Sequence, residues 1–206
     1  MIKALIFDNF GVLMDCTHSK LSAMFPKFAD KIDAINIQAD LGEISDETRD
    51  DEIAKLIGSR EPVDRVVNAA KVNRELLDYI LELHKHYKTG ILSATGANFW
   101  RYFDAADLRA RFNDVLLSYQ VHLTKPNPAI FRLAAQRLGV KTDECVFVDD
   151  IPANIAAAEN VGMRGILYKN FVQFRQELNA ILERNGSRAD DGNSRDDFAK
   201  GESQNA

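Results

Sequence analysis

A single carboxylate, Asp8, stands at the end of the first apolar run of the chain. The run Ala4-Leu5-Ile6-Phe7 has the length and composition of a buried strand, and Gly11 suits the turn that follows. In an open α/β sheet, a side chain at the carboxyl end of a strand faces the crevice where ligands bind. Because an unpaired buried carboxylate is costly, we expect Asp8 to serve a metal ion or a substrate.

Three later segments also place polar groups beside apolar runs or in restrained loops. The run Gly90-Ile91-Leu92 ends on the hydroxyl of Ser93, and Lys125 lies in a loop that prolines restrict. The run Cys145–Val148 ends on two adjacent carboxylates, Asp149 and Asp150. Adjacent carboxylates repel each other, so a cation is expected near them.

The order Asp, then Ser, then Lys-Pro, then Asp-Asp resembles the haloacid dehalogenase-like (HAD) hydrolase superfamily, subfamily IA. The resemblance runs from about Ile2 to Lys169. It implies an α/β fold, a doubly wound parallel sheet with the HAD-like Rossmannoid core, and a small α-helical cap inserted after the first strand. Each motif alone is weak, and the prediction rests on their order and spacing.

The resemblance implies a role for each catalytic motif. Asp8 would attack a phosphoryl group and form an aspartyl intermediate, which water then hydrolyses. Ser93, Ala94 and Lys125 would bind the phosphoryl oxygens, and Lys125 would also neutralise the nucleophile.

The resemblance also implies a Mg²⁺ cofactor, because a hard cation can bridge a carboxylate and a phosphate that repel each other. Its ligands would be Asp8, the backbone carbonyl of Phe10 and Asp150. Asp149 would either bind the ion or lie one contact away from it.

Phe10 departs from the pattern of most HAD phosphatases, which carry a second aspartate two residues after the nucleophile. That aspartate protonates the leaving alkoxide and then activates water. Its loss removes general acid–base assistance worth about 10²–10⁴ in rate. His18 and His122 lie where either could replace it, although a structural role is the more common one for such histidines.

Three functions are compatible with Phe10. A Mg²⁺-dependent phosphatase of a small phosphorylated metabolite with a good leaving group, such as a sugar 1-phosphate, is favoured by the acidic pair. The turn Asp40–Ser45 also resembles the glucose-1-phosphate phosphatase branch. A 2-haloacid dehalogenase is disfavoured, because those enzymes lack the paired acids. A catalytically weak module that binds a phosphorylated ligand or a protein is the third.

The composition narrows the partners and the location. The chain has 206 residues, 46% of them hydrophobic, with a net charge of −5 and a pI near 5.4. This balance argues against nucleic-acid binding, and no apolar stretch approaches a membrane span. We expect a cytoplasmic protein without a signal peptide. Cys16 and Cys145 show no metal-ligand spacing, and the oligomeric state stays open.

The elements that position these motifs are predicted to form a core of residues 1–15 and 86–184. Residues 16–85 are expected to form a cap of about four helices, and residues 186–206 a disordered tail. The alternating pattern predicts a parallel sheet. The expected strands are 2–7, 90–92, 115–117, 146–148 and 165–168, and the later helices are 99–106, 128–138, 151–161 and 171–184.

Overall fold

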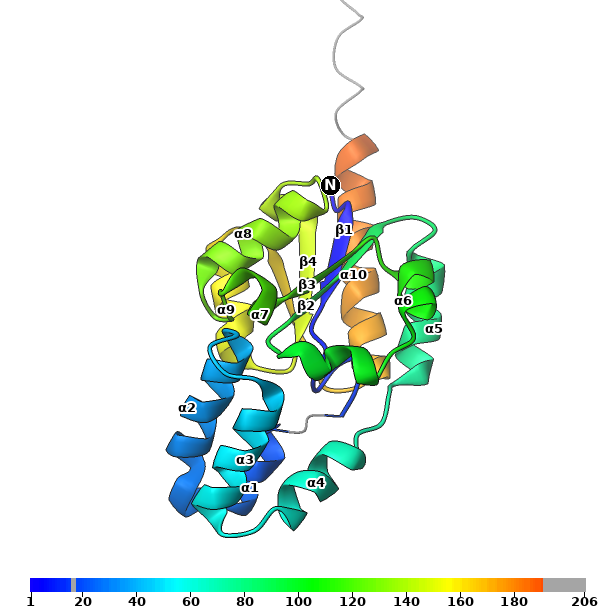
Figure 1. Cartoon of the computed structure of the whole chain (residues 1–206). Helices are drawn as coiled ribbons and strands as arrows, with labels where there is room; N and C mark the ends of the chain where they lie inside the picture. Colours follow the sequence, from blue (N-terminus) through cyan, green and yellow to red (C-terminus); the bar gives the residue numbers. More distant parts are fainter. Residues whose placement is uncertain (16–17, 191–206) are drawn as a thin grey trace, which may run out of the picture.

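Five parallel strands form one sheet in the order β3-β2-β1-β4-β5. The computed structural model describes residues 1–15 and 18–190 (Figure 1). This sheet confirms the predicted doubly wound α/β fold. The strands are β1 (Ala4–Phe7), β2 (Lys88–Ser93), β3 (Asp114–Leu117), β4 (Cys145–Asp149) and β5 (Arg164–Leu167).

The strand order places the first strand at the point where the topology reverses. β1 lies between β2 and β4, with Phe7 paired to Ile91 on one side and to Val148 on the other. In doubly wound sheets, the crevice at this switch point is where ligands bind. The residues that directly follow β1 and β4 therefore meet in that crevice.

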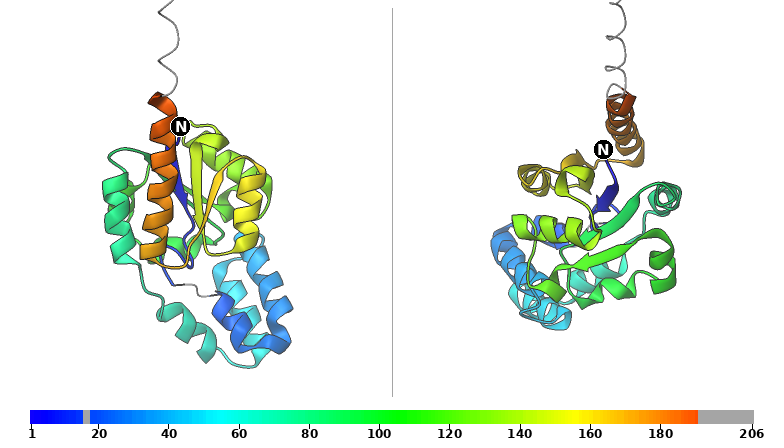
Figure 2. Two further views of the ribbon diagram at one scale, coloured as in Figure 1. Left: turned by 180° about the vertical axis from the view of Figure 1, so that it is seen from behind. Right: turned by 90° about the horizontal axis from the view of Figure 1, so that it is seen from above.

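Helices cover both faces of the sheet, as the two further views show (Figure 2). Leu5 and Phe7 of β1 pack in one apolar cluster with α5 (Arg74–Leu83), α6 (Ala105–Arg111) and α10 (Phe171–Asp190). Ala4 and Ile6 point to the opposite face and pack with α8 (Pro128–Arg137) and α9 (Pro152–Asn160). This alternation follows the two-residue period of a strand that is buried on both faces.

Four helices between β1 and α5 share a smaller apolar cluster of their own, built on Leu21, Ile32, Ile53, Val63 and Val66. We call them the cap helices. Figure 1 shows them grouped at the end of the molecule toward which β1 runs. They are α1 (His18–Met24), α2 (Ala29–Asp40), α3 (Asp46–Ile57) and α4 (Glu61–Asn68), with a 3-10 turn η1 (Pro26–Phe28).

Local signals explain the ends of two cap-side helices. The Ser45 hydroxyl accepts a hydrogen bond from the Thr48 N–H at the start of α3, and Gly58 ends the helix with a φ of 81°. Asn73 caps α5 in the same way, with its side chain accepting from the Leu76 N–H. These are the capping residues expected at helix ends.

The expected cap, residues 16–85, includes α5, and α5 packs on the sheet and not in the apolar cluster of the cap helices. Leu76, Leu77 and Ile80 belong to the cluster that contains Phe7, because their apolar stripe faces the sheet. The predicted helix around residues 99–106 is also two elements, η2 (Ala97–Arg101) and α6. Asp104 starts α6 afresh because its carboxylate accepts from the N–H groups of Ala106 and Asp107.

The last helix is longer than predicted. We expected it to end at residue 184 and the tail to begin at residue 186, whereas α10 extends through Asp190. The rest of the predicted tail, residues 191–206, lies outside the described residues, as does Cys16. Among the helices that the structure describes, none combines the length and apolar character needed to cross a membrane. The remaining short elements are α7 (Ser118–Val121) and η3 (Thr142–Glu144).

Candidate active site

The loop after β1 holds Asp8 level with the end of β4. The Asp8 N–H donates to the Val148 carbonyl at 2.8 Å, which continues the strand pairing by one residue. The Asn9 carbonyl then accepts from the N–H groups of Leu13 and Met14 and closes the turn. Gly11 has a φ of 91°, and a Cβ there would lie 2.2 Å from Oδ2 of Asp150. Glycine is therefore required by both the backbone conformation and the close carboxylate.

Lys125 joins the first and fourth motifs. Its Nζ lies 2.6 Å from Oδ1 of Asp8 and 2.7 Å from Oδ2 of Asp149, and all three side chains are buried. A lysine between two carboxylates offsets the repulsion that would otherwise oppose their burial. The predicted nucleophile and the predicted lysine are thus in direct contact.

Burial and charge set the protonation of this cluster. Burial raises the pKa of Asp8 to about 7, although Lys125 lowers it; the Asp149 charge adds to the rise. Burial acts to lower the pKa of Lys125, but the carboxylates of Asp8 and Asp149 raise it above its ordinary value. Lys125 therefore stays charged, and a further cation beside Asp8 would lower the pKa of that carboxyl.

The two adjacent acids have different surroundings. Both oxygens of Asp149 accept hydrogen bonds, at 2.8 Å from the Ile151 N–H and at 3.1 Å from Nδ2 of Asn154. Within the described part of the chain, the buried Oδ1 of Asp150 has no hydrogen-bond partner. Burial, then the Asp149 charge, raises the pKa of Asp150. Asp150 is therefore the acid with an oxygen left for another ligand.

One oxygen each from Asp8, Asp149 and Asp150 lies within 4.8 Å of the others. Three carboxylate oxygens at such separations suit a hard divalent cation. The unpartnered oxygen of Asp150 and the raised pKa of Asp8 both fit a cation at this place. A cation would give the Asp150 oxygen a partner and would lower the pKa of Asp8. Phe10, whose carbonyl is the other predicted ligand, lies in the same turn as Asp8.

Ser93 ends β2 on the other side of β1. Its hydroxyl is fully buried, and among the residues described it has no hydrogen-bond partner. The half-buried Ala94 and the buried Thr95 follow it. The Ser118 hydroxyl fixes this turn, since it accepts from the Thr95 N–H at 2.8 Å and donates to the Thr95 carbonyl at 3.1 Å. Ser118 was not singled out by sequence analysis, because a serine after β3 carries no motif.

Phe10 and His122 each make a contact that the structure describes. The Phe10 ring packs edge-on against Tyr102, with centroids 6.5 Å apart. His122 is exposed, and its Nδ1 lies 2.8 Å from the Leu41 carbonyl, so it joins the cap to the loop before Lys125. The side chain of His18 lies outside the described residues.

The turn between α2 and α3 brings cap residues onto the loops that carry Ser93 and Lys125. Oδ2 of Asp46 accepts from the Asn98 N–H at 2.8 Å, and a Cβ on Gly42 would lie 2.8 Å from the Tyr119 carbonyl. The buried guanidinium of Arg49 pairs with Asp46 at 2.6 Å and Asp50 at 2.8 Å. The turn was recognised in the sequence, but the buried charges of α3 were not, because charged helix residues are ordinarily exposed.

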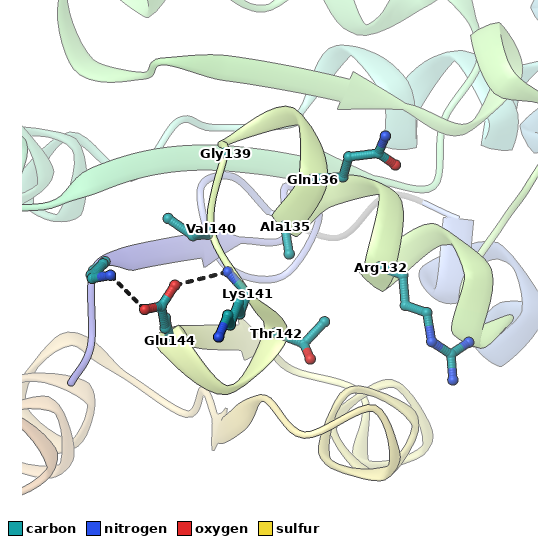
Figure 3. Close-up of a pocket in the computed structure, with 9 residues that line it drawn as sticks. Arg132, Ala135, Gln136, Gly139, Val140, Lys141, Thr142 and Glu144 are labelled. Atoms are coloured by element: carbon teal, nitrogen blue, oxygen red, sulfur yellow. Dashed lines mark hydrogen bonds and ion pairs between the residues drawn. The ribbon is translucent and has the colours of Figure 1, made fainter.

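A hollow lies at the opposite edge of the sheet, where β1 and β4 begin (Figure 3). It has a volume of about 650 Å³ and is lined by Lys3, Arg132, Lys141 and Glu144 among others. Glu144 accepts from Nζ of Lys3 at 2.5 Å and from the Lys141 N–H at 2.9 Å. The pair of Lys3 and Glu144 is therefore open to solvent, unlike the buried pair of Lys125 and Asp8.

A doubly wound sheet with a lysine-paired aspartate and two adjacent aspartates at its switch point defines an enzyme-like site built around a carboxylate. Residues 2–162 match the family model of the haloacid dehalogenase-like hydrolases, and the chain belongs to that family of hydrolases. The match covers most of the chain and includes every predicted site residue.

Individual relatives also belong to this family or resemble it in fold. The chain is 29% identical over 204 residues to a D-ribitol-5-phosphate phosphatase of Bacteroides thetaiotaomicron, covering 88% of this chain and 99% of the relative. A HAD family enzyme from that organism, solved with magnesium and inorganic phosphate, is 26% identical with a TM-score of 0.66, covering 82% of this chain and 95% of that one. A HAD-like hydrolase from Porphyromonas gingivalis is 25% identical with a TM-score of 0.71, covering 88% and 98%.

Proposed function

We propose that this chain is a Mg²⁺-dependent phosphatase of a small phosphorylated metabolite, of the sugar or polyol phosphate class. The observation that carries the proposal is the ion pair of Lys125 with Asp8 beside an unpartnered Asp150 oxygen and an unpartnered Ser93 hydroxyl. Buried polar atoms without partners are rare in native proteins, so they indicate ligands that complete the site. A metal ion would bind the Asp150 oxygen, and a phosphoryl oxygen would accept a hydrogen bond from the Ser93 hydroxyl.

The proposed reaction begins with Asp8. One of its oxygens attacks phosphorus and the ester oxygen leaves, which gives an aspartyl phosphate that water then hydrolyses. Lys125 holds Asp8 in place and compensates charge on the phosphoryl oxygens. The Ser93 hydroxyl and the Ala94 N–H donate to those oxygens.

The residues that would hold Mg²⁺ are Asp8, Asp150 and the Phe10 carbonyl, with Asp149 committed to Lys125 and Asn154. When bound, the ion offsets the repulsion between the nucleophilic carboxylate and the phosphate. A thermal unfolding series with Mg²⁺ tests this assignment separately from activity. Mg²⁺ should raise the Tm of the wild type, should not raise that of Asp150→Asn, and should raise that of Asp143→Asn, a control at the opposite sheet edge.

The similarity to a D-ribitol-5-phosphate phosphatase supports a polyol or sugar phosphate as substrate. The narrower expectation of a sugar 1-phosphate stays a prediction, as does a cytoplasmic location. Phe10 is the observation that favours a second candidate, a module that binds a phosphorylated ligand with little turnover.

A substrate screen tests the proposed function. Purified protein is assayed with ribitol 5-phosphate, sugar 1-phosphates, sugar 6-phosphates, an acyl phosphate and 4-nitrophenyl phosphate, each with Mg²⁺ and with EDTA. Turnover that EDTA abolishes supports the phosphatase. Tight binding of phosphate without turnover of any ester would support the binding module, and metal-independent halide release from 2-haloacids would support a dehalogenase.

A further inference from the structure

Three carboxylates of the cap helices α2 and α3 are buried or half-buried, and they differ in how they are engaged. Asp46 is held by Arg49 and by the Asn98 N–H, and Asp50 is held by Arg49. Asp40 ends α2 and is half-buried. Across the described residues, the Asp40 carboxyl makes neither a hydrogen bond nor an ion pair. Of these three, Asp40 is therefore the carboxyl that is left available to a substrate.

The position of Asp40 is fixed from both sides. The next residue, Leu41, is joined to His122 by the 2.8 Å contact of its carbonyl with Nδ1. Gly42 lies against the Tyr119 carbonyl, so the end of α2 sits on the segment that leads to Lys125. On the other side of the turn, Asp46 is bound to the loop that follows Ser93. Asp40 thus lies on the cap segment that bridges the two phosphate-binding loops.

The charged groups around Asp40 connect it with the nucleophile. Lys125, which contacts Asp8, acts electrostatically on Asp40, and so do Arg49 and Asp46 of α3. Burial raises the pKa of Asp40 to about 7, while Arg49 and Lys125 lower it and Asp46 raises it. An acid with a pKa near neutrality can both donate and accept a proton under working conditions.

We propose that Asp40, supplied by the cap, is the proton-transfer residue that replaces the acid missing at Phe10. This inference rests on the proposed phosphatase function and deepens it. The cap contacts on both phosphate-binding loops hold Asp40 within electrostatic reach of Lys125, which contacts Asp8.

The proposed reaction has two steps, and Asp40 gives up a proton in the first and regains one in the second. First, an Asp8 oxygen bonds to phosphorus and the bond from phosphorus to the ester oxygen breaks. Its electron pair goes to that oxygen, which takes the proton of Asp40 and leaves as an alcohol. Then water bonds to phosphorus and gives a proton to the Asp40 carboxylate. The bond between Asp8 and phosphorus breaks, and inorganic phosphate leaves. The net reaction is ester plus water to alcohol plus phosphate.

The test compares two esters in the full-length protein with Mg²⁺. Ribitol 5-phosphate releases a basic alkoxide that needs a proton, whereas 4-nitrophenyl phosphate releases a weakly basic phenolate that does not. In Asp40→Asn, we expect kcat/KM for ribitol 5-phosphate to fall at least about 10²-fold. For the nitrophenyl ester, kcat/KM should stay within about threefold of the wild type, because it reports only the first step.

The second step supplies a signature that a structural role would not give. Without a base, hydrolysis of the aspartyl phosphate becomes slow, so Asp40→Asn should show a burst of nitrophenolate equal to one turnover per enzyme. The wild-type kcat/KM for ribitol 5-phosphate should fall as the pH rises through about 7, since Asp40 must be protonated. The kcat/KM for the nitrophenyl ester should not show this fall, which we call the pH limb. Asp40→Glu, which retains an acid, should recover part of the alkyl ester activity.

Asp30→Asn is the matched control, an exposed aspartate of the same helix that should leave both esters unaffected. An equal fall of kcat/KM for both esters in Asp40→Asn, or no fall, would overturn the role of Asp40. Wild-type turnover of the nitrophenyl ester alone would also overturn it, because an acid in place should permit alkyl esters. A wild type that hydrolyses neither ester would instead overturn the proposed function. If Asp40→Asn is unfolded in thermal melts, the pH limb and Asp40→Glu decide the question.

Discussion

The two edges of the sheet hold the same kind of ion pair in opposite surroundings. At the carboxyl edge, Lys125 and Asp8 lie 2.6 Å apart with side chains that are 3% and 6% exposed. At the amino edge, Lys3 and Glu144 lie 2.5 Å apart with side chains that are 57% and 17% exposed. The distances are nearly equal, so the difference in behaviour comes from burial.

Burial changes what each carboxylate can do. The pKa of Asp8 is raised to about 7 by desolvation, whereas backbone and lysine hydrogen bonds lower the pKa of Glu144. The carboxyl edge also keeps buried oxygens of Ser93 and Asp150 without partners in the described structure. The comparison teaches that unsatisfied buried groups, rather than charge pairs as such, distinguish the candidate active site.

Replacing the lysine of each pair should give the largest difference between the two edges in stability and turnover. Lys125→Met leaves Asp8 and Asp149 buried together without a cation. We expect the free energy of unfolding to fall by about 3 kcal/mol and turnover to fall at least about 10³-fold. Urea unfolding and phosphatase assays measure these losses. Lys3→Met is the matched control and should change neither property by a comparable amount, because exposed pairs contribute little. Equal losses in the two variants would contradict the comparison.

A hydroxyl without a partner should matter for ligand binding and little for folding. In Ser93→Ala, we expect the inhibition constant of inorganic phosphate to rise about tenfold, with an unchanged free energy of unfolding. Ser118→Ala provides the contrast, because that hydroxyl makes two hydrogen bonds to Thr95. It should lower the free energy of unfolding by about 1 kcal/mol. Competitive inhibition assays and urea melts check both. A destabilised Ser93→Ala with normal phosphate binding would show that Ser93 is structural.

The smallest effect is expected at the amino edge. Glu144 has a lowered pKa in the folded state. Its ionised form therefore stabilises the protein at pH values above 4.5, the ordinary pKa of a glutamate. That stabilisation is lost as the pH falls through the folded pKa. Glu144→Gln should therefore lower the Tm slightly at neutral pH, match the wild type in acid and keep full activity. A clear loss of turnover would indicate that this edge takes part in function.

The sequence predicted the sheet and the placement of its polar ends, because apolar runs and turn residues are local signals. It did not predict that α5 packs on the sheet, since the stripe of Leu76, Leu77 and Ile80 suits either a cap or a core neighbour. The burial of Asp40 and Arg49 was also not predicted. Their burial arises from docking of the cap on loops more than 50 residues away in sequence, as in the hydrogen bond from the Asn98 N–H to Asp46. Such long-range contacts leave no periodic pattern.

Trapping the phosphorylated enzyme tests the central claim most directly. The protein is mixed with Mg²⁺ and 4-nitrophenyl phosphate, quenched during turnover and treated with borohydride, which reduces an aspartyl phosphate to homoserine. Peptide mass spectrometry then locates the modified residue, and Asp8→Asn serves as the control. We predict modification at Asp8 in the wild type, none in Asp8→Asn, and no turnover by that variant. Turnover without modification at Asp8, or residual Mg²⁺-dependent turnover in Asp8→Asn, would contradict the account.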